Sequence, residues 1–267
     1  MEYQFVQSGT ARIVYHERGS GDPLVLLMGF GADGGVWEKH AAHYEKHFRC
    51  ILPDNRGVGR SDQPAGSYTT TMMAADTIAV MDHAGISQAQ VAGISMGGAI
   101  AQELAINYPE RVRSLALVST WARFNNYATV VYQNLKHIRA AVTPDIFMEL
   151  LQLWLYAPPF YEKYIHELNK AAVEQQEYTQ SRNGFEGQLD ACIQHNAIDR
   201  LHQIKVPVLI TVGTMDIFTP PEFSRAIHSK ITHSEFSVYP TGGHVHHWED
   251  LKRFNDETLH FFNTNRV

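Results

Sequence analysis

The chain has little of what marks several classes of protein. It contains only two cysteines among 267 residues, Cys50 and Cys192, which lie far apart and show no metal-type spacing. We therefore expect two buried free thiols rather than a disulfide. It also lacks an excess of basic residues, because its formal net charge is −6. This balance argues against nucleic acid as the main partner.

Long apolar segments are absent from the sequence as well. No uninterrupted apolar run approaches the roughly 20 residues that a membrane-spanning helix needs. The first four residues do not begin a signal peptide, since no basic region precedes an apolar stretch. We expect a cytoplasmic protein without a membrane partner. The composition, 44% hydrophobic and 19% charged, suits one buried core that carries at most an inserted segment.

Strand and helix patterns alternate through most of the chain. Two short alternating segments over residues 3–16 predict an antiparallel hairpin. Apolar runs then predict strands near residues 24–28, 49–52, 90–92, 115–118, 206–212 and 236–239, and helical patterns cover residues 35–47, 70–83 and 98–107. This alternation favours an α/β fold with a mostly parallel sheet and helices on both faces.

One segment interrupts the alternation. Residues 121–202 contain no convincing strand, only helical patterns broken at Pro144 and at residues 158–159. We therefore predict a core formed by residues 1–120 and 203–267, with residues 121–202 inserted as a helical lid. The lid is rich in aromatic residues, most of which we expect to pack it onto the core, while a few line an apolar pocket.

A G-x-S-x-G pentapeptide at residues 93–97 is the most informative motif. Ser95 lies at its centre, between an apolar run and a helix-forming stretch. Strand, sharp turn and helix form the context of a nucleophile elbow, in which glycines allow the strained turn. The alternative is a tight strand–helix turn with a serine that caps the helix. The choice depends on whether the rest of the chain supplies a base and an acid.

Both groups follow at the expected places. Asp216 lies in the loop after one predicted strand, and His244 follows two glycines after the next strand. The chain order Ser95, Asp216, His244 is the nucleophile, acid and base order of α/β-hydrolases. Rival residues fit this order less well. Those for the acid are Asp190, Asp199 and Asp250; those for the base are His246 and His247, which enter the last helix.

With these residues the chain resembles an α/β-hydrolase-fold serine hydrolase of the esterase and enol-lactonase-like branch. The likeness spans nearly the whole length. It includes the glycines around Phe30, the segment at residues 54–62, the elbow, a G-x-x-D-x-x-x-P segment from Gly213, and the late Gly-His. It implies an α/β-hydrolase fold: a mostly parallel central sheet with helices on both faces and an inserted helical lid.

The resemblance also implies an oxyanion hole made of backbone N–H groups. The donors are Met96, directly after the nucleophile, and Phe30 in the loop after the third strand. Many relatives have a histidine where this chain has Met28, so a polar residue that supports this loop is missing. Candidate pocket residues are Phe30, Trp121, Trp154, Phe218 and Val245.

These residues predict a hydrolase that cleaves carboxylic esters or lactones of small, largely apolar substrates through an acyl-enzyme on Ser95. The expected partner is a small molecule, with neither cofactor nor metal, and the oligomeric state stays open. A serine nucleophile argues against dehalogenases and epoxide hydrolases, and Met96 differs from the tryptophan of many non-haem haloperoxidases. The alternatives are a carbon–carbon bond hydrolase of a ring-cleavage pathway and a small-molecule receptor with a retained triad.

Three smaller questions concern charged groups and histidines. An enol-lactonase for an anionic diacid needs a cation in the lid, and the sequence offers Arg123, Lys136, Arg139 and Arg182. Residues 54–62 predict a loop braced by its own ion pairs and glycine turns. The histidines at positions 244, 246 and 247 lack a suitably spaced carboxylate or cysteine partner, which argues against a metal cluster.

Overall fold

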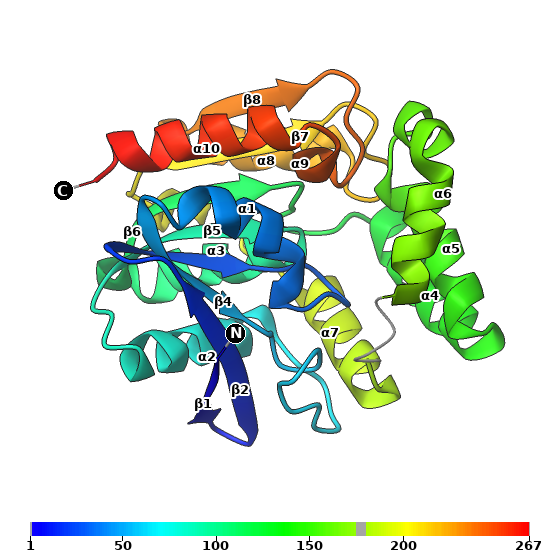
Figure 1. Ribbon diagram of the computed structural model, residues 1–267, viewed down its shortest axis with the longest axis horizontal. Helices are drawn as coiled ribbons and strands as arrows, with labels where there is room; N and C mark the ends of the chain where they lie inside the picture. Colours follow the sequence, from blue (N-terminus) through cyan, green and yellow to red (C-terminus); the bar gives the residue numbers. More distant parts are fainter. Residues whose placement is uncertain (1, 175–179, 267) are drawn as a thin grey trace.

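The computed structural model describes residues 2–174 and 180–266 and is built around one eight-stranded sheet (Figure 1). The strand order is β1-β2-β4-β3-β5-β6-β7-β8. The strands are β1 (Tyr3–Ser8), β2 (Ala11–Arg18), β3 (Asp22–Leu27), β4 (Phe48–Pro53), β5 (Ala89–Ile94), β6 (Val112–Val118), β7 (Val208–Gly213) and β8 (Glu235–Tyr239). The β1–β2 hairpin is antiparallel, and β2 also pairs antiparallel with β4. All neighbouring pairs among β3 to β8 are parallel. The predicted α/β class is confirmed.

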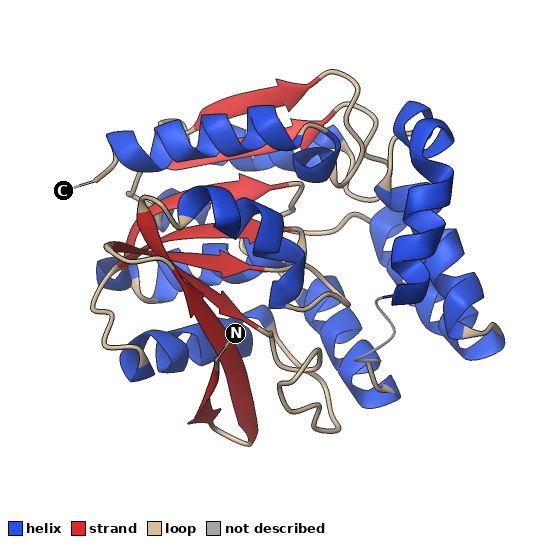
Figure 2. Ribbon diagram, viewed as in Figure 1, coloured by secondary structure: helices blue, strands red, loops and turns tan. Residues whose placement is uncertain are grey.

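Helices cover both faces of the sheet (Figure 2). The core helices are α1 (Glu38–Tyr44), α2 (Thr70–His83), α3 (Met96–Asn107), α8 (Pro221–Lys230), α9 (His246–Glu249) and α10 (Leu251–Thr264). Two apolar clusters separate the faces. One joins α1 and α10 to the sheet through Tyr44 and Phe262, and the other joins α2, α3 and α8 through Met73, Leu104 and Ile227.

Between β6 and β7, the described residues form four α-helices. They are α4 (Asn126–Ala141), α5 (Pro144–Leu155), α6 (Pro158–Glu174) and α7 (Arg182–Gln194), and we call residues 121–202 the insertion. Pro144 and Pro158 are the first residues of α5 and α6, a position that tolerates proline because its N–H has no acceptor within the helix. Figure 1 shows α4, α5 and α6 beyond the carboxyl ends of the parallel strands. The insertion thus lies at the sheet edge that bears the predicted catalytic residues.

Other expectations differ in their outcome. The predicted helix at residues 35–47 begins as a 3₁₀ turn (Gly34–Trp37) and becomes α1 only from Glu38, because the Asp33 carboxylate accepts the Gly35 N–H at 2.9 Å. Cys50 and Cys192 are buried and unbridged, as expected. In the described parts of the chain, every helix is too short or too polar to cross a membrane.

Candidate active site

Ser95 occupies a strained turn between β5 and α3. Its backbone has φ 55° and ψ −118°, a conformation that costs a non-glycine residue roughly 1–3 kcal/mol. Two contacts hold it. The Ser95 N–H donates to the Val118 carbonyl at 2.8 Å, and the Thr120 hydroxyl donates to the Ser95 carbonyl at 2.7 Å. This geometry is that of a nucleophile elbow.

The two glycines of the motif are required by close backbone contacts. A Cβ at Gly93 would collide with the Gly97 carbonyl, and a Cβ at Gly97 would collide with the Leu27 carbonyl of β3. The turn therefore packs directly onto the neighbouring strand. The Ser95 side chain is mostly covered, since the residue is only 3% exposed.

Asp216 and His244 form a buried hydrogen-bonded pair. The distance from His244 Nδ1 to Asp216 Oδ2 is 3.0 Å. The other carboxylate oxygen of Asp216 accepts the N–H groups of Phe218 at 3.0 Å and Thr219 at 2.8 Å. The Thr219 hydroxyl lies 2.9 Å from Asp216 Oδ2 and 3.0 Å from His244 Nδ1. These contacts fix the Nδ1 side of the imidazole and leave Nε2 for another partner.

Ser95 lies at the same sheet edge as this pair, because β5, β7 and β8 run parallel within one sheet and end beside one another. The hydrogen bonds among the described residues do not include one between Ser95 and His244. In unliganded enzymes such bonds are often long and tighten only with substrate. Aromatic contacts bridge the two. Phe218 meets the His244 ring edge-on at 5.1 Å, Tyr132 stacks on Phe218 at 4.9 Å, and the Tyr132 hydroxyl lies beside Ser95.

The loop that contains Phe30 runs alongside Ser95. A Cβ at Gly29 would lie 3.2 Å from Ser95 Cβ and 3.7 Å from its Oγ, so the main chain approaches this closely only because residue 29 is glycine. Met96 is the first residue of α3, where a backbone N–H has no acceptor within the helix. Both predicted oxyanion donors, the N–H groups of Phe30 and Met96, therefore belong to segments that border Ser95.

Side chains from two other segments support this loop. The Asn55 amide donates to the Met28 carbonyl at 2.8 Å. The Gly31 N–H donates to the Gln188 side-chain carbonyl of α7 at 2.9 Å, and the Gln188 amide group donates to the Arg56 carbonyl at 2.9 Å. A polar side chain at Met28 is therefore not needed, since Asn55 and Gln188 hold the main chain.

The segment at residues 54–62 is braced differently from the expectation. Arg56 pairs with Asp76 of α2 at 2.6 Å, and Asp62 accepts the Arg12 N–H of β2 at 2.9 Å, so these contacts reach outside the segment. Asp54 accepts the Arg60 N–H within the segment and the Gly34 N–H outside it, while burial raises the pKa of its carboxyl. The prediction of purely internal ion pairs is wrong for Arg56.

Three of the candidate pocket residues join one aromatic group beside the pair. The ring of Phe218 stacks on Tyr132 at 4.9 Å and on Trp154 at 6.1 Å, both with an interplanar angle of 16°. Phe30 contacts Tyr132 at 6.3 Å and Phe185 at 5.0 Å. Phe218 and Phe30 thus contact Tyr132 near Ser95, and Trp154 joins this group through Phe218.

The other two candidates have different surroundings. Trp121 is fully buried, stacks on Phe124 at 4.3 Å and reaches Tyr132 only at 6.0 Å. Val245 is half-buried, and its N–H donates to the Leu155 carbonyl at 3.1 Å. Trp121 therefore supports Tyr132 through packing, and Val245 connects the histidine loop to the insertion.

The four cations named as candidates in the sequence analysis have other partners or face solvent. Lys136 and Arg182 both pair with Glu186, at 3.0 and 2.8 Å. The Arg139 guanidinium lies over an aromatic ring of α5 at 5.6 Å, and Arg123 is exposed. None of these contacts places a cation against the Asp216–His244 pair.

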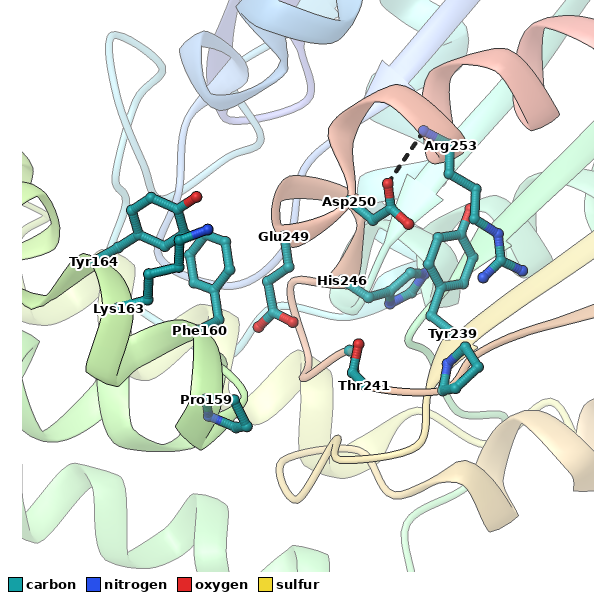
Figure 3. A pocket seen from close by; sticks show the side chains of 12 residues that line it. Pro159, Phe160, Lys163, Tyr164, Tyr239, Thr241, His246, Glu249, Asp250 and Arg253 are labelled. Carbon is teal, nitrogen blue, oxygen red and sulfur yellow. Dashed lines mark hydrogen bonds between the residues drawn. The ribbon is translucent and has the colours of Figure 1, made fainter.

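Sequence reasoning missed Glu249, which joins the insertion to the loop of the predicted base. One oxygen of its carboxylate accepts the Ala157 N–H at 2.7 Å, and the other accepts the Gly243 N–H at 2.9 Å. Burial raises the pKa of this carboxyl. Figure 3 shows Glu249 between α6 and the loop that carries Thr241. Tyr132 and Thr219 were missed too, and no local pattern marks any of the three.

A surface hollow of about 240 Å³ adjoins this contact (Figure 3). Phe160 and Tyr164 of α6 line one side, and Tyr239 and Arg253 line the other. Ser95 is not among its lining residues. Ser95, Asp216 and His244 are each at most 3% exposed, so the candidate site is buried.

His246 has a structural role beside the candidate base. Its two ring nitrogens contact the Ser119 hydroxyl at 3.2 Å and the Thr211 hydroxyl at 3.0 Å, and burial lowers its pKa to about 3. Within residues 2–174 and 180–266, no group of three or more histidine, cysteine or acidic side chains is arranged to hold a metal ion.

Comparisons with known proteins agree with this geometry. Residues 22–251 match the family model described as the alpha/beta hydrolase fold. The chain belongs to the alpha/beta hydrolase fold family. It is a hydrolase of that family, and the predicted resemblance and fold are confirmed.

Named relatives of this hydrolase span almost its entire length. A putative carbamate hydrolase RutD of Azorhizobium caulinodans is 29% identical, covering 96% of this chain and 97% of the relative. A putative non-heme bromoperoxidase BpoC of Mycobacterium tuberculosis is 31% identical, covering 94% and 97%. The structure of an esterase from Thermogutta terrifontis matches with a TM-score of 0.89 at 23% identity, covering all of both chains. This last likeness concerns the fold alone.

Proposed function

We propose that this hydrolase cleaves carboxylic esters or lactones of small, largely apolar substrates through an acyl-enzyme on Ser95. One observation carries the proposal: the 3.0 Å hydrogen bond between His244 and Asp216 lies at the sheet edge where the elbow presents Ser95. A serine becomes a strong nucleophile only when a base takes its proton and an acid orients that base.

In this mechanism Ser95 Oγ attacks the substrate carbonyl, and its proton passes to His244 Nε2. Asp216 orients the imidazole and stabilises its charged form. The backbone N–H groups of Phe30 and Met96 bind the oxyanion, where the loss of one donor costs on the order of 3 kcal/mol. His244 then activates the water that releases the acyl group.

The surroundings of Ser95 support a small apolar substrate. The rings of Phe218 and Phe30 contact Tyr132 beside the proposed nucleophile, and Trp154 stacks on Phe218. A doubly anionic substrate fits this site poorly, because the four candidate cations pair with Glu186, cover a ring or face solvent. Apolar acyl groups gain free energy from burial against such rings.

The test is a substrate panel for the wild type and Ser95→Ala, with Ser229→Ala as an exposed serine control. The panel contains short p-nitrophenyl esters, lactones, a carbamate and a carbon–carbon cleavage substrate. We expect wild type and Ser229→Ala to hydrolyse esters or lactones equally, and Ser95→Ala to lose at least about 10⁴-fold in kcat.

Two results would contradict the proposal. Full activity of Ser95→Ala would exclude the acyl-enzyme. Binding of lactones without turnover by the wild type would favour a receptor instead.

A further inference from the structure

Tyr132 of α4 is the residue of the insertion whose hydroxyl lies beside the nucleophile. It is fully buried, and its ring is confined on several sides. It stacks on Phe218 at 4.9 Å, tilts against Phe124 at 4.6 Å and contacts Trp121 at 6.0 Å. Because these rings pack closely, the hydroxyl of Tyr132 has a fixed position.

That hydroxyl has no well-aligned hydrogen-bond partner among the described residues. It lies close enough to the Ser95 side chain to interact with it, and it also senses the charge of Asp216. Burial raises the pKa of Tyr132 well above its usual value, so the group keeps its proton and acts as a donor. A buried hydroxyl without a partner is unfavourable, and proteins retain few of them. Its position therefore points to a partner atom that arrives with the substrate.

The neighbours of Tyr132 indicate which substrate atom this is. Tyr132 contacts Phe30 at 6.3 Å and stacks on Phe218, which contacts the His244 ring at 5.1 Å. Tyr132 therefore borders both the loop of the proposed oxyanion donor and the proposed base. The oxyanion already has two main-chain donors in the proposed mechanism, at Phe30 and Met96. The leaving-group oxygen, to which the base returns its proton, has no such donor.

We infer that Tyr132 is a catalytic residue whose hydroxyl donates a hydrogen bond to the leaving-group oxygen, an inference that rests on the proposed function. When the tetrahedral intermediate collapses, the carbon–oxygen bond breaks and its electron pair goes to the leaving oxygen. His244 Nε2 delivers the proton to that oxygen, and Tyr132 keeps its own. The stabilisation is greatest where negative charge on the leaving oxygen is least stable. The preferred substrates are therefore alkyl esters and lactones, which release an alcohol, rather than activated aryl or enol esters.

The test compares Tyr132→Phe with Tyr127→Phe, an exposed tyrosine of the same helix. Values of kcat/KM are measured for p-nitrophenyl, phenyl and ethyl esters of one acid, beside wild type and Ser95→Ala. We expect Tyr132→Phe to lose about tenfold on the ethyl ester and less than about twofold on the p-nitrophenyl ester, since one hydrogen bond is removed. Tyr127→Phe should match wild type on all three.

Thermal unfolding separates this role from a structural one. Tyr132→Phe keeps the ring and removes only an unpaired hydroxyl, so its Tm should equal or exceed that of wild type. A loss of kcat/KM that is equal for all three esters, or no loss, would overturn the inference while the proposed function stands. If wild type hydrolyses none of the esters and lactones, the proposed function fails, and the inference fails with it.

Discussion

The two loops that carry Asp216 and His244 are held in different ways. In the acid loop, residues 213–220, the carboxylate accepts N–H groups from positions two and three residues further along. In the histidine loop, residues 240–249, some supports come from the insertion: Val245 donates to Leu155, and Glu249 joins Ala157 to Gly243. The carboxylate of the proposed acid is thus held by nearby main-chain groups, whereas the loop of the proposed base also bonds to a segment about 90 residues away.

The largest expected effect comes from the acid loop. Asp216→Asn keeps an acceptor for the two N–H groups but no longer holds the charged imidazole. We expect kcat to fall about 10³- to 10⁴-fold with an unchanged Tm. The measurement is ester hydrolysis beside thermal unfolding. A loss of less than tenfold would show that another group orients His244.

A smaller effect is expected from the support of the histidine loop. Glu249→Gln leaves one good acceptor for two buried N–H groups, so the insertion and the loop separate. We expect kcat/KM to fall about tenfold, because a small displacement of a catalytic group is costly, and Tm to fall as well. Glu235→Gln is the exposed control.

Unchanged activity in Glu249→Gln would show that the position of His244 does not depend on the contact between Glu249 and the insertion. Increased proteolysis of the insertion in Glu249→Gln, but not in Glu235→Gln, would support the role of Glu249 in holding the insertion to the histidine loop.

The smallest effect is the response of the histidine loop to acid. Burial lowers the pKa of His246 to about 3, below the usual value of 6.5. Between pH 3 and pH 6.5 this histidine therefore binds a proton in the unfolded chain but not in the folded protein. Its contribution to stability is full above pH 6.5 and declines as the pH falls toward 3. We expect the free energy of unfolding to fall by about 1 kcal/mol per pH unit below 6.5 for this residue. Urea unfolding at pH 7 and 5.5 measures the change.

His40 is a second buried histidine with a pKa lowered to about 4, and it adds a decline of the same sign. His246→Gln should reduce the slope, while exposed His137→Gln should not. If the free energy of unfolding changes equally with pH in wild type and His246→Gln, His246 is not a source of the acid sensitivity.

The sequence predicted the fold because its signals are periodic and local. Apolar runs gave the strands, and the order of Ser95, Asp216 and His244 agreed with their places at one sheet edge. Helix starts were less certain, as at residues 35–47, where the Asp33 side chain sets a 3₁₀ turn first. Terminal turns of helices are often 3₁₀, so sequence patterns locate helix ends less well than helix interiors.

The supports of the site could not be predicted in this way. Glu249 binds two backbone N–H groups, and a backbone group leaves no trace in sequence. Tyr132 is one of many aromatic residues in the insertion, and only packing shows that it borders Ser95. Thr219 was hidden similarly, since its role depends on a hydroxyl that contacts both Asp216 and His244.

The ties between the insertion and the core restrict how such enzymes can be recombined. Gln188 of α7 accepts the Gly31 N–H in the loop of the proposed oxyanion donor Phe30, and Ala157 bonds to Glu249 beside the histidine loop. Exchanging the insertion for that of a relative would therefore replace two contacts that position the proposed catalytic groups, together with the proposed substrate pocket. A chimera needs a glutamine in register with Gly31 and a free N–H facing Glu249 before its new specificity can be expressed.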